Sequence, residues 1–279
     1  MPGIGFALGA TLCGGIADTL TKKTITDSGR YKAIVYNSVV FIALLFIGAF
    51  ILGVPFVFPP ELVAAYIVQS IVGAAAGAAF FKAFESGKAS ILAPLCSLYV
   101  LVVVFLGVTV FGESLSIFQF GGAALVVLSA FVLAFEDIKS FKLEKGVLYL
   151  VLTVIGWGYY YSYIKVFIPS MGPYMTTLAL ESGVAFFVIA YYIAKGKDIS
   201  PPPSSQAPLI AVRSFIIFLG ALLYTYAVAG IGVALTSVIV AGTPLVSVPA
   251  SHFMLGEKLS AYKYAAILLI VLGLMMVLV

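Results

Sequence analysis

Two ionisable side chains lie within long apolar stretches of the sequence, where an uncompensated charge is costly. Glu181 falls in the stretch 173–194 and Arg213 in the stretch 208–229. Ionisable groups in such segments usually face the protein interior and mark ligand, ion or proton sites. The two residues therefore favour binding of a small zwitterion or amine, with proton uptake by Glu181 as a further candidate role.

A structural ion pair between Glu181 and Arg213 is the alternative, and the sequence leaves it open. A helical rise of ~1.5 Å per residue across a ~30 Å apolar layer puts their backbones about 10 Å apart in depth. Two long side chains would barely span that distance. A ligand with charges of both signs would fit between them.

Polar side chains recur at matching places in the two halves of the sequence. Asn37 and Gln69 occupy the positions equivalent to Glu181 and Arg213 when the sequence is shifted by 144 residues. Both halves thus place a polar group at the same two positions, and only the second half carries charges there. We expect all four side chains to face one site.

An aromatic run in the stretch 145–165 adds a second component. Trp157 and Tyr160 share a helix face and lie near the middle of the stretch, which favours an inward aromatic wall. Tyrosines also form belts at the lipid interface, and this alternative stays open. The expected substrate site consists of Glu181, Asn37, Gln69, Arg213, Trp157, Tyr160, Tyr99, Tyr224, Ser97 and Thr243.

The sequence shows no pattern typical of an enzyme. His252 is the single histidine, and we expect it to be a hydrogen-bonded core group. Paired carboxylates at one depth, metal-ligand spacing and a glycine-rich phosphate loop are all missing from the sequence, so no cofactor or metal is expected. The net charge of +4 comes without a free basic stripe, which argues against a nucleic-acid partner.

Composition places the chain in a membrane. Hydrophobic residues make up 63% of the 279 residues and charged residues 9%, against about 25% charged in soluble domains. A helix needs about 20 apolar residues to cross the hydrocarbon core. Ten stretches meet or approach this length: 4–21, 32–54, 62–84, 88–111, 115–135, 145–165, 173–194, 208–229, 232–255 and 259–279.

The sequence contains an internal repeat. The segment 80–116 recurs as 224–260, so that Gly112-Glu113 aligns with Gly256-Glu257. Five spans in each half make the second copy inverted in the membrane. We therefore expect an all-α integral membrane protein of ten transmembrane helices, with one five-helix repeat at 1–135, a linker at 136–144 and an inverted second repeat at 145–279.

These motifs are similar to those of the drug/metabolite transporter superfamily, EamA type. The resemblance rests on the segment 88–94 and on Gly-Glu-Xaa-Leu-Ser at 112–116 and 256–260, and it covers both halves. It implies a secondary transporter with its substrate site between the repeats and with the fifth and tenth spans outside the cavity. We expect the protein to transport a small metabolite by alternating access. The expected substrate is an amino acid or a similar zwitterion or amine, and a proton is the candidate coupling ion. A non-transport membrane protein with the same fold is the alternative.

Charge distribution predicts the orientation in the cell membrane. Fourteen of the 15 basic residues lie on the face of the loops between spans one and two, three and four, five and six, seven and eight, and nine and ten. The opposite face holds only Lys165. The positive-inside rule then puts both termini outside, although the family resemblance implies cytoplasmic termini. The chain is expected to act as a monomer or homodimer surrounded by lipid.

Small residues and two glutamates carry local structural expectations. Gly5 and Gly9, and likewise Gly73 and Gly77, have the four-residue spacing that lets helices approach closely in lipid. Glu113 and Glu257 each stand just before an apolar stretch, and we expect each to partner a helix N-terminus.

Overall fold

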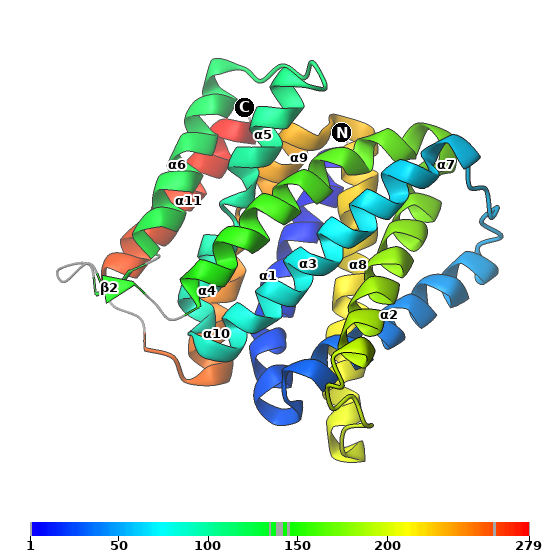
Figure 1. Ribbon diagram of the computed structural model, residues 1–279. Coiled ribbons are helices and arrows are strands. Elements are labelled where there is room, and N and C mark those ends of the chain that lie inside the picture. Colours follow the sequence, from blue (N-terminus) through cyan, green and yellow to red (C-terminus); the bar gives the residue numbers. More distant parts are fainter. Residues whose placement is uncertain (1, 134, 138–141, 144–145, 259–260, 279) are drawn as a thin grey trace.

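The computed structural model describes residues 2–133, 135–137, 142–143, 146–258 and 261–278, and almost all of them are helical (Figure 1). The helices are α1 (Pro2–Ser28), α2 (Arg30–Ile51), α3 (Val63–Ser86), α4 (Ala89–Cys96), α5 (Tyr99–Thr109), α6 (Ile117–Leu133), α7 (Val147–Ala194), α8 (Ala207–Ile231), α9 (Val233–Val240), α10 (Pro244–Leu255) and α11 (Ala261–Leu278). Short 3-10 turns η1 (Pro60–Leu62) and η2 (Ser204–Gln206) precede α3 and α8. The expectation of a purely helical chain needs one correction, because β1 (Phe135–Asp137) and β2 (Lys142–Leu143) pair antiparallel in the linker.

Backbone breaks explain why the helices differ in length from the apolar stretches. Helix α7 contains Gly172 with a φ of 71°, between Pro169 and Pro173, so it consists of two helices that meet at a sharp bend. Figure 1 shows the chain turning back at this point. The fourth and ninth stretches are each interrupted near the middle, as α4 and α5 and as α9 and α10. Prolines lie close to both interruptions: Pro94 is inside α4 and Pro244 begins α10. Proline lacks a backbone N–H donor and disrupts a continuous helix, which accounts for the two breaks.

The two halves of the chain pack against each other in a reciprocal pattern. Helix α1 lies along α8, α3 along α7 and α6 along α11. Helix α4 contacts α10, and α5 contacts α9. Each of these contacts joins an element of the first half to one of the second, so the halves interlock as a single bundle.

Small residues let several of these helices approach closely. A Cβ atom on Gly9 would meet Leu223, one on Gly73 would meet Tyr160 and Val184, and one on Gly122 would overlap the backbone of α11. The expected close packing is thus found at Gly9 and Gly73. It is absent at Gly5 and Gly77, where a Cβ atom would meet no atom of the described chain within 4 Å.

Glu113 and Glu257 form a pair of crossed helix caps. The Glu113 carboxylate accepts hydrogen bonds from the amides of Val233 and Ala234, at 3.0 and 2.8 Å, at the start of α9. The Glu257 carboxylate accepts them from the amides of Ala89 and Ser90, also at 3.0 and 2.8 Å, at the start of α4. Each glutamate thus caps a helix of the other half. The sequence predicted helix N-termini as partners, and the tertiary structure shows which ones they are.

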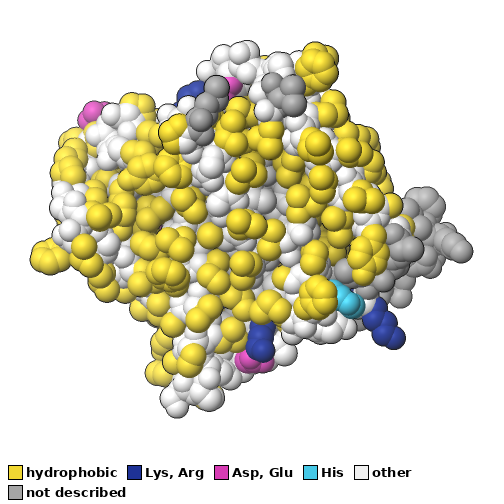
Figure 2. All heavy atoms as spheres, turned by 180° about the vertical axis from the view of Figure 1, so that it is seen from behind, with side chains coloured by type: hydrophobic (Ala, Val, Ile, Leu, Met, Phe, Trp, Pro, Cys, Tyr) yellow, Lys and Arg dark blue, Asp and Glu magenta, His cyan; other side chains and the backbone are white. Residues whose placement is uncertain are grey.

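The outer surface is that of a protein surrounded by lipid. Seven helical segments in the described ranges are long and apolar enough to cross a membrane when α4 with α5, and α9 with α10, are each taken as one segment, and α6 and α11 are shorter apolar helices. Large hydrophobic side chains such as Phe50 and Phe253 are more than four-fifths exposed. Figure 2 shows hydrophobic side chains over the middle of one face and charged side chains near its edges. Such a surface is stable in hydrocarbon and would aggregate in water.

Candidate functional site

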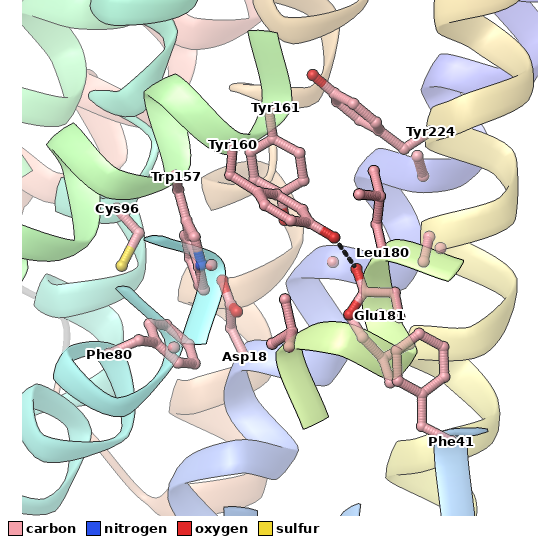
Figure 3. Close-up of a pocket in the computed structure, with 18 of the residues that line it drawn as sticks. Asp18, Phe41, Phe80, Cys96, Trp157, Tyr160, Tyr161, Leu180, Glu181 and Tyr224 are labelled. Carbon is pink, nitrogen blue, oxygen red and sulfur yellow. Dashed lines mark hydrogen bonds between the residues drawn. The ribbon is translucent and has the colours of Figure 1, made fainter. Parts of the chain in front are cut away.

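A cavity of about 220 Å³ lies between the two halves of the bundle (Figure 3). Its wall includes residues of α1, α2, α3 and α4 from the first half and of α7, α8 and α9 from the second. The cavity suits a small metabolite better than a drug-sized ligand.

Nine of the ten site residues expected from the sequence line this cavity. They come from four helices, α2, α5, α7 and α8, and from the two short connections within the fourth and ninth stretches: Asn37, Ser97, Tyr99, Trp157, Tyr160, Glu181, Arg213, Tyr224 and Thr243. Helical periodicity brings each to the inner face of its own element. The bend at Gly172 brings the two parts of α7 back to the same cavity.

Gln69 is the expected residue that does not line the cavity. Its side-chain amide donates a hydrogen bond to the carbonyl of Tyr160, and the side chain is only 1% exposed. The small Gly73 lets α7 come close to α3, so Gln69 is covered by α7. Gln69 therefore holds the backbone beneath Tyr160, and its placement at the ligand surface is corrected.

Glu181 points into the cavity from the second part of α7. The Tyr160 hydroxyl donates a hydrogen bond to the Glu181 carboxylate at 3.0 Å (Figure 3). This bond links the two parts of α7 across the bend. It occupies one carboxylate oxygen, and the other accepts no hydrogen bond from a described residue.

Arg213 is the one cationic side chain among the described residues that line the cavity. Its Nε donates to the Thr21 hydroxyl at 3.0 Å, and its guanidinium lies 5.4 Å from the centre of the Phe81 ring. Within the described chain it forms no ion pair with Glu181 inside 4.0 Å. The structural pair considered from the sequence is therefore not formed. The side chain is only 8% exposed, and both of its terminal nitrogens lack an acceptor among the described residues.

Aromatic rings form a continuous wall on one side of the cavity. Ring centres are 4.7 Å apart between Phe80 and Trp157, 6.1 Å between Trp157 and Tyr161, and 4.7 Å between Tyr161 and Tyr224. Tyr99 lies 5.0 Å from Tyr161. These rings are buried or half-buried at the cavity, which removes them from the lipid belt considered as the alternative.

Hydroxyl and amide groups around the cavity are held by the protein. The Asn37 amide donates to the carbonyl of Ala33 and its oxygen accepts from Ser214. The Thr243 hydroxyl donates to the carbonyl of Val240 at 2.6 Å. These bonds fix the orientation of the polar wall before any ligand arrives.

Asp18 is a cavity residue that the sequence-based site did not include. It lines the cavity from α1, and Figure 3 shows its carboxylate on the side where Trp157, Phe80 and Cys96 lie. The signal was present, because Asp18 is an acidic residue within the apolar stretch 4–21. Asp18 stands only three residues from the end of that stretch, where a polar helix end is ordinary, so its sequence position alone does not assign it to the site.

Helices α6 and α11 contribute none of the described residues that line the cavity. They pack on each other, with Gly122 and Gly273 at the crossing. The position of these two helices agrees with the expectation that the fifth and tenth spans lie outside the cavity.

Comparison with known proteins agrees with the repeat and with the fold. The model of the EamA-like transporter family matches residues 1–135 and again residues 144–279. A crystal structure of a protein with 18% sequence identity superposes with a TM-score of 0.70, over 97% of this chain and 98% of the other. At that identity the likeness concerns the fold alone. Comparison with curated proteins gives no match.

The cavity between interlocked helical halves, with the family match in both halves, defines a membrane transport protein. The chain belongs to the EamA-like transporter family, within the drug/metabolite transporter superfamily.

Proposed function

We propose that this protein is a secondary-active transporter that moves a small amino acid, or a similar zwitterion or amine, by alternating access. The observation that supports this best is the central cavity, which both halves enclose and which holds fixed charges of both signs. Such charges at membrane depth are retained in proteins for binding or translocation.

The proposed topology has ten crossings in two inverted repeats of five. The two parts of α7 count as separate crossings, and α4 with α5 and α9 with α10 form one crossing each. The reciprocal helix contacts and the crossed glutamate caps support this symmetry. In inverted-repeat carriers, one half rocks against the other around a site near the midplane. We further propose that the protein resides in the cell membrane, as a monomer or homodimer, with both termini outside.

Glu181 has two candidate roles in this cycle. It binds the amine of the substrate, or it takes up the proton that drives accumulation. Glu181→Gln distinguishes them, because the variant keeps the shape of the side chain and removes the charge. In proteoliposomes, loss of pH-driven uptake with intact exchange would assign the proton role. Loss of both binding and exchange would assign the amine role.

The assay is counterflow of labelled lysine, norleucine, phenylalanine and cadaverine into proteoliposomes preloaded with the same unlabelled compounds. Glu61→Gln is the matched control, because Glu61 is exposed and outside the cavity. Normal binding, exchange and pH-driven uptake in Glu181→Gln would contradict the site assignment. Failure of the wild-type protein to exchange any of these compounds would contradict transport of an amino acid or amine and favour the non-transport alternative.

A further inference from the structure

Asp18 has no role in the site as described so far, yet it carries the least compensated charge in the cavity. Its carboxylate makes no hydrogen bond or ion pair with any residue in the described ranges, whereas Glu181 accepts a bond from Tyr160. Asp18 interacts electrostatically with Arg213 at longer range. Asp18 is half-buried at the cavity. A carboxylate that is partly withdrawn from water and lacks a direct partner is costly, so a cationic ligand group that pairs with it would be stabilised.

The charges on the cavity wall do not balance. Among the described lining residues, Asp18 and Glu181 are acidic and Arg213 is basic. Two negative charges and one positive charge leave a formal sum of −1. A neutral zwitterion would leave this excess in place, whereas a ligand with a net charge of +1 would cancel it.

The wall beside Asp18 suits a cationic group. Figure 3 shows the Asp18 carboxylate on the same side of the cavity as Trp157 and Phe80. The centres of these two rings are 4.7 Å apart. Aromatic faces attract ammonium and guanidinium groups, most strongly where water is excluded.

The guanidinium of Arg213 suits the opposite charge. Only its Nε is bonded, to Thr21, while both terminal nitrogens lack acceptors in the described chain. The side chain is 8% exposed and lines the cavity. A carboxylate can accept two parallel hydrogen bonds from the N–H groups of a guanidinium.

We propose that Asp18 binds a second cationic group of the substrate, so that the cavity selects a compound with one carboxylate and two amines. The ligand carboxylate would face Arg213, one ammonium Glu181 and the other Asp18. This assignment rests on the proposed transport function and narrows it from zwitterions and amines to dibasic amino acids of the size of lysine.

The test compares three probes of similar length on full-length protein in lipid nanodiscs. Lysine carries all three groups, norleucine lacks the side-chain ammonium and cadaverine lacks the carboxylate. Calorimetric titration should give lysine an affinity at least about tenfold above that of norleucine and of cadaverine. If norleucine binds to the wild-type protein as tightly as lysine does, this result is sufficient to overturn the proposal.

Two variants locate the effect. Asp18→Asn should weaken lysine binding at least about tenfold and leave norleucine binding unchanged, which removes the preference. Asp27→Asn is the control, because Asp27 lies exposed near the end of the same helix and outside the cavity. An unchanged ratio of lysine to norleucine affinity in Asp18→Asn would refute the role of Asp18.

Counterflow separates this proposal from the function on which it rests. Exchange of norleucine as readily as lysine would preserve the transport function and reject the dibasic substrate. Selective lysine binding without exchange of any probe would support the Asp18 subsite and reject transport. If Asp18→Asn does not yield monodisperse protein, Asp18→Glu is tested instead. This variant keeps the charge and should still prefer lysine to norleucine. Loss of that preference in Asp18→Glu would count against the proposal.

Discussion

The crossed caps predict that Glu113 and Glu257 stabilise the junction of the two halves unequally. Both carboxylates accept two backbone hydrogen bonds at a helix N-terminus with matching distances. Glu113 also accepts a bond from Lys165 at 2.5 Å, and the two side chains are 13% and 36% exposed. Glu257, the glutamate of the second cap, forms no such ion pair with any described residue.

Substitution by glutamine removes the charge and one of the two acceptors. A hydrogen bond to a charged group contributes about 1.5–3 kcal/mol, and the helix dipole adds about 0.5 kcal/mol. Glu257→Gln should therefore lower the free energy of unfolding by about 2–3 kcal/mol. The half-exposed pair with Lys165 contributes up to about 1 kcal/mol, so Glu113→Gln should lower the free energy of unfolding by about 2–4 kcal/mol, up to about 1 kcal/mol more than Glu257→Gln does.

Unfolding by SDS titration in mixed micelles, followed by circular dichroism, measures these differences. Lys165→Met should cost up to about 1 kcal/mol in the wild type and nothing further in Glu113→Gln, which isolates the pair by a double-mutant cycle. Glu61→Gln serves as an exposed control and should remain within about 0.5 kcal/mol of the wild type. The reasoning fails if Glu257→Gln costs more than Glu113→Gln, or if both match the control.

Three further predictions concern orientation, packing and acidity. In a background without native cysteines, a cysteine at Ser204 should be shielded from an impermeant thiol reagent in intact cells; labelling from outside would reverse the proposed topology. Gly158→Ala should lower stability by about 1–3 kcal/mol in the same SDS titration, because its Cβ atom would overlap a valine of α5, whereas Gly77→Ala should leave stability unchanged, because its Cβ atom meets open space at the cavity. Hydrogen bonds from Ser200 and then the nearby Lys32 lower the pKa of Asp198 from 3.8 to about 2. The folded state is therefore favoured above the ordinary pKa and loses this contribution as pH falls toward about 2, and Asp198→Asn should abolish that part of the acid dependence of unfolding.

The amino-acid sequence alone predicts the membrane character, the repeat and nine of the residues that line the cavity. Long apolar stretches require helices in lipid, because every backbone polar group must be bonded within its own segment. The offset of 144 residues located the equivalent elements of the two halves. The positions of Glu181 and Arg213 well inside apolar stretches indicate a functional site, since a charge at membrane depth is costly and is usually retained for binding or translocation.

The rotation of each helix about its axis could not be predicted. A helix that is apolar on all sides shows no stripe to distinguish an inward face from one that meets lipid. Gln69 and Asp18 show the consequence. The sequence predicts Gln69 in the site, but α7 covers this side chain, whereas Asp18 is not predicted there and lines the cavity.

Contacts between distant segments also depended on the tertiary structure. The sequence places Glu113 and Glu257 before their following helices, and local reasoning would pair them there. The interlocked halves instead bring each carboxylate to the first amides of a helix in the other half. Hydrogen-bond partners are set by the positions of the helix ends in space, and close packing of small residues between the halves decides those positions.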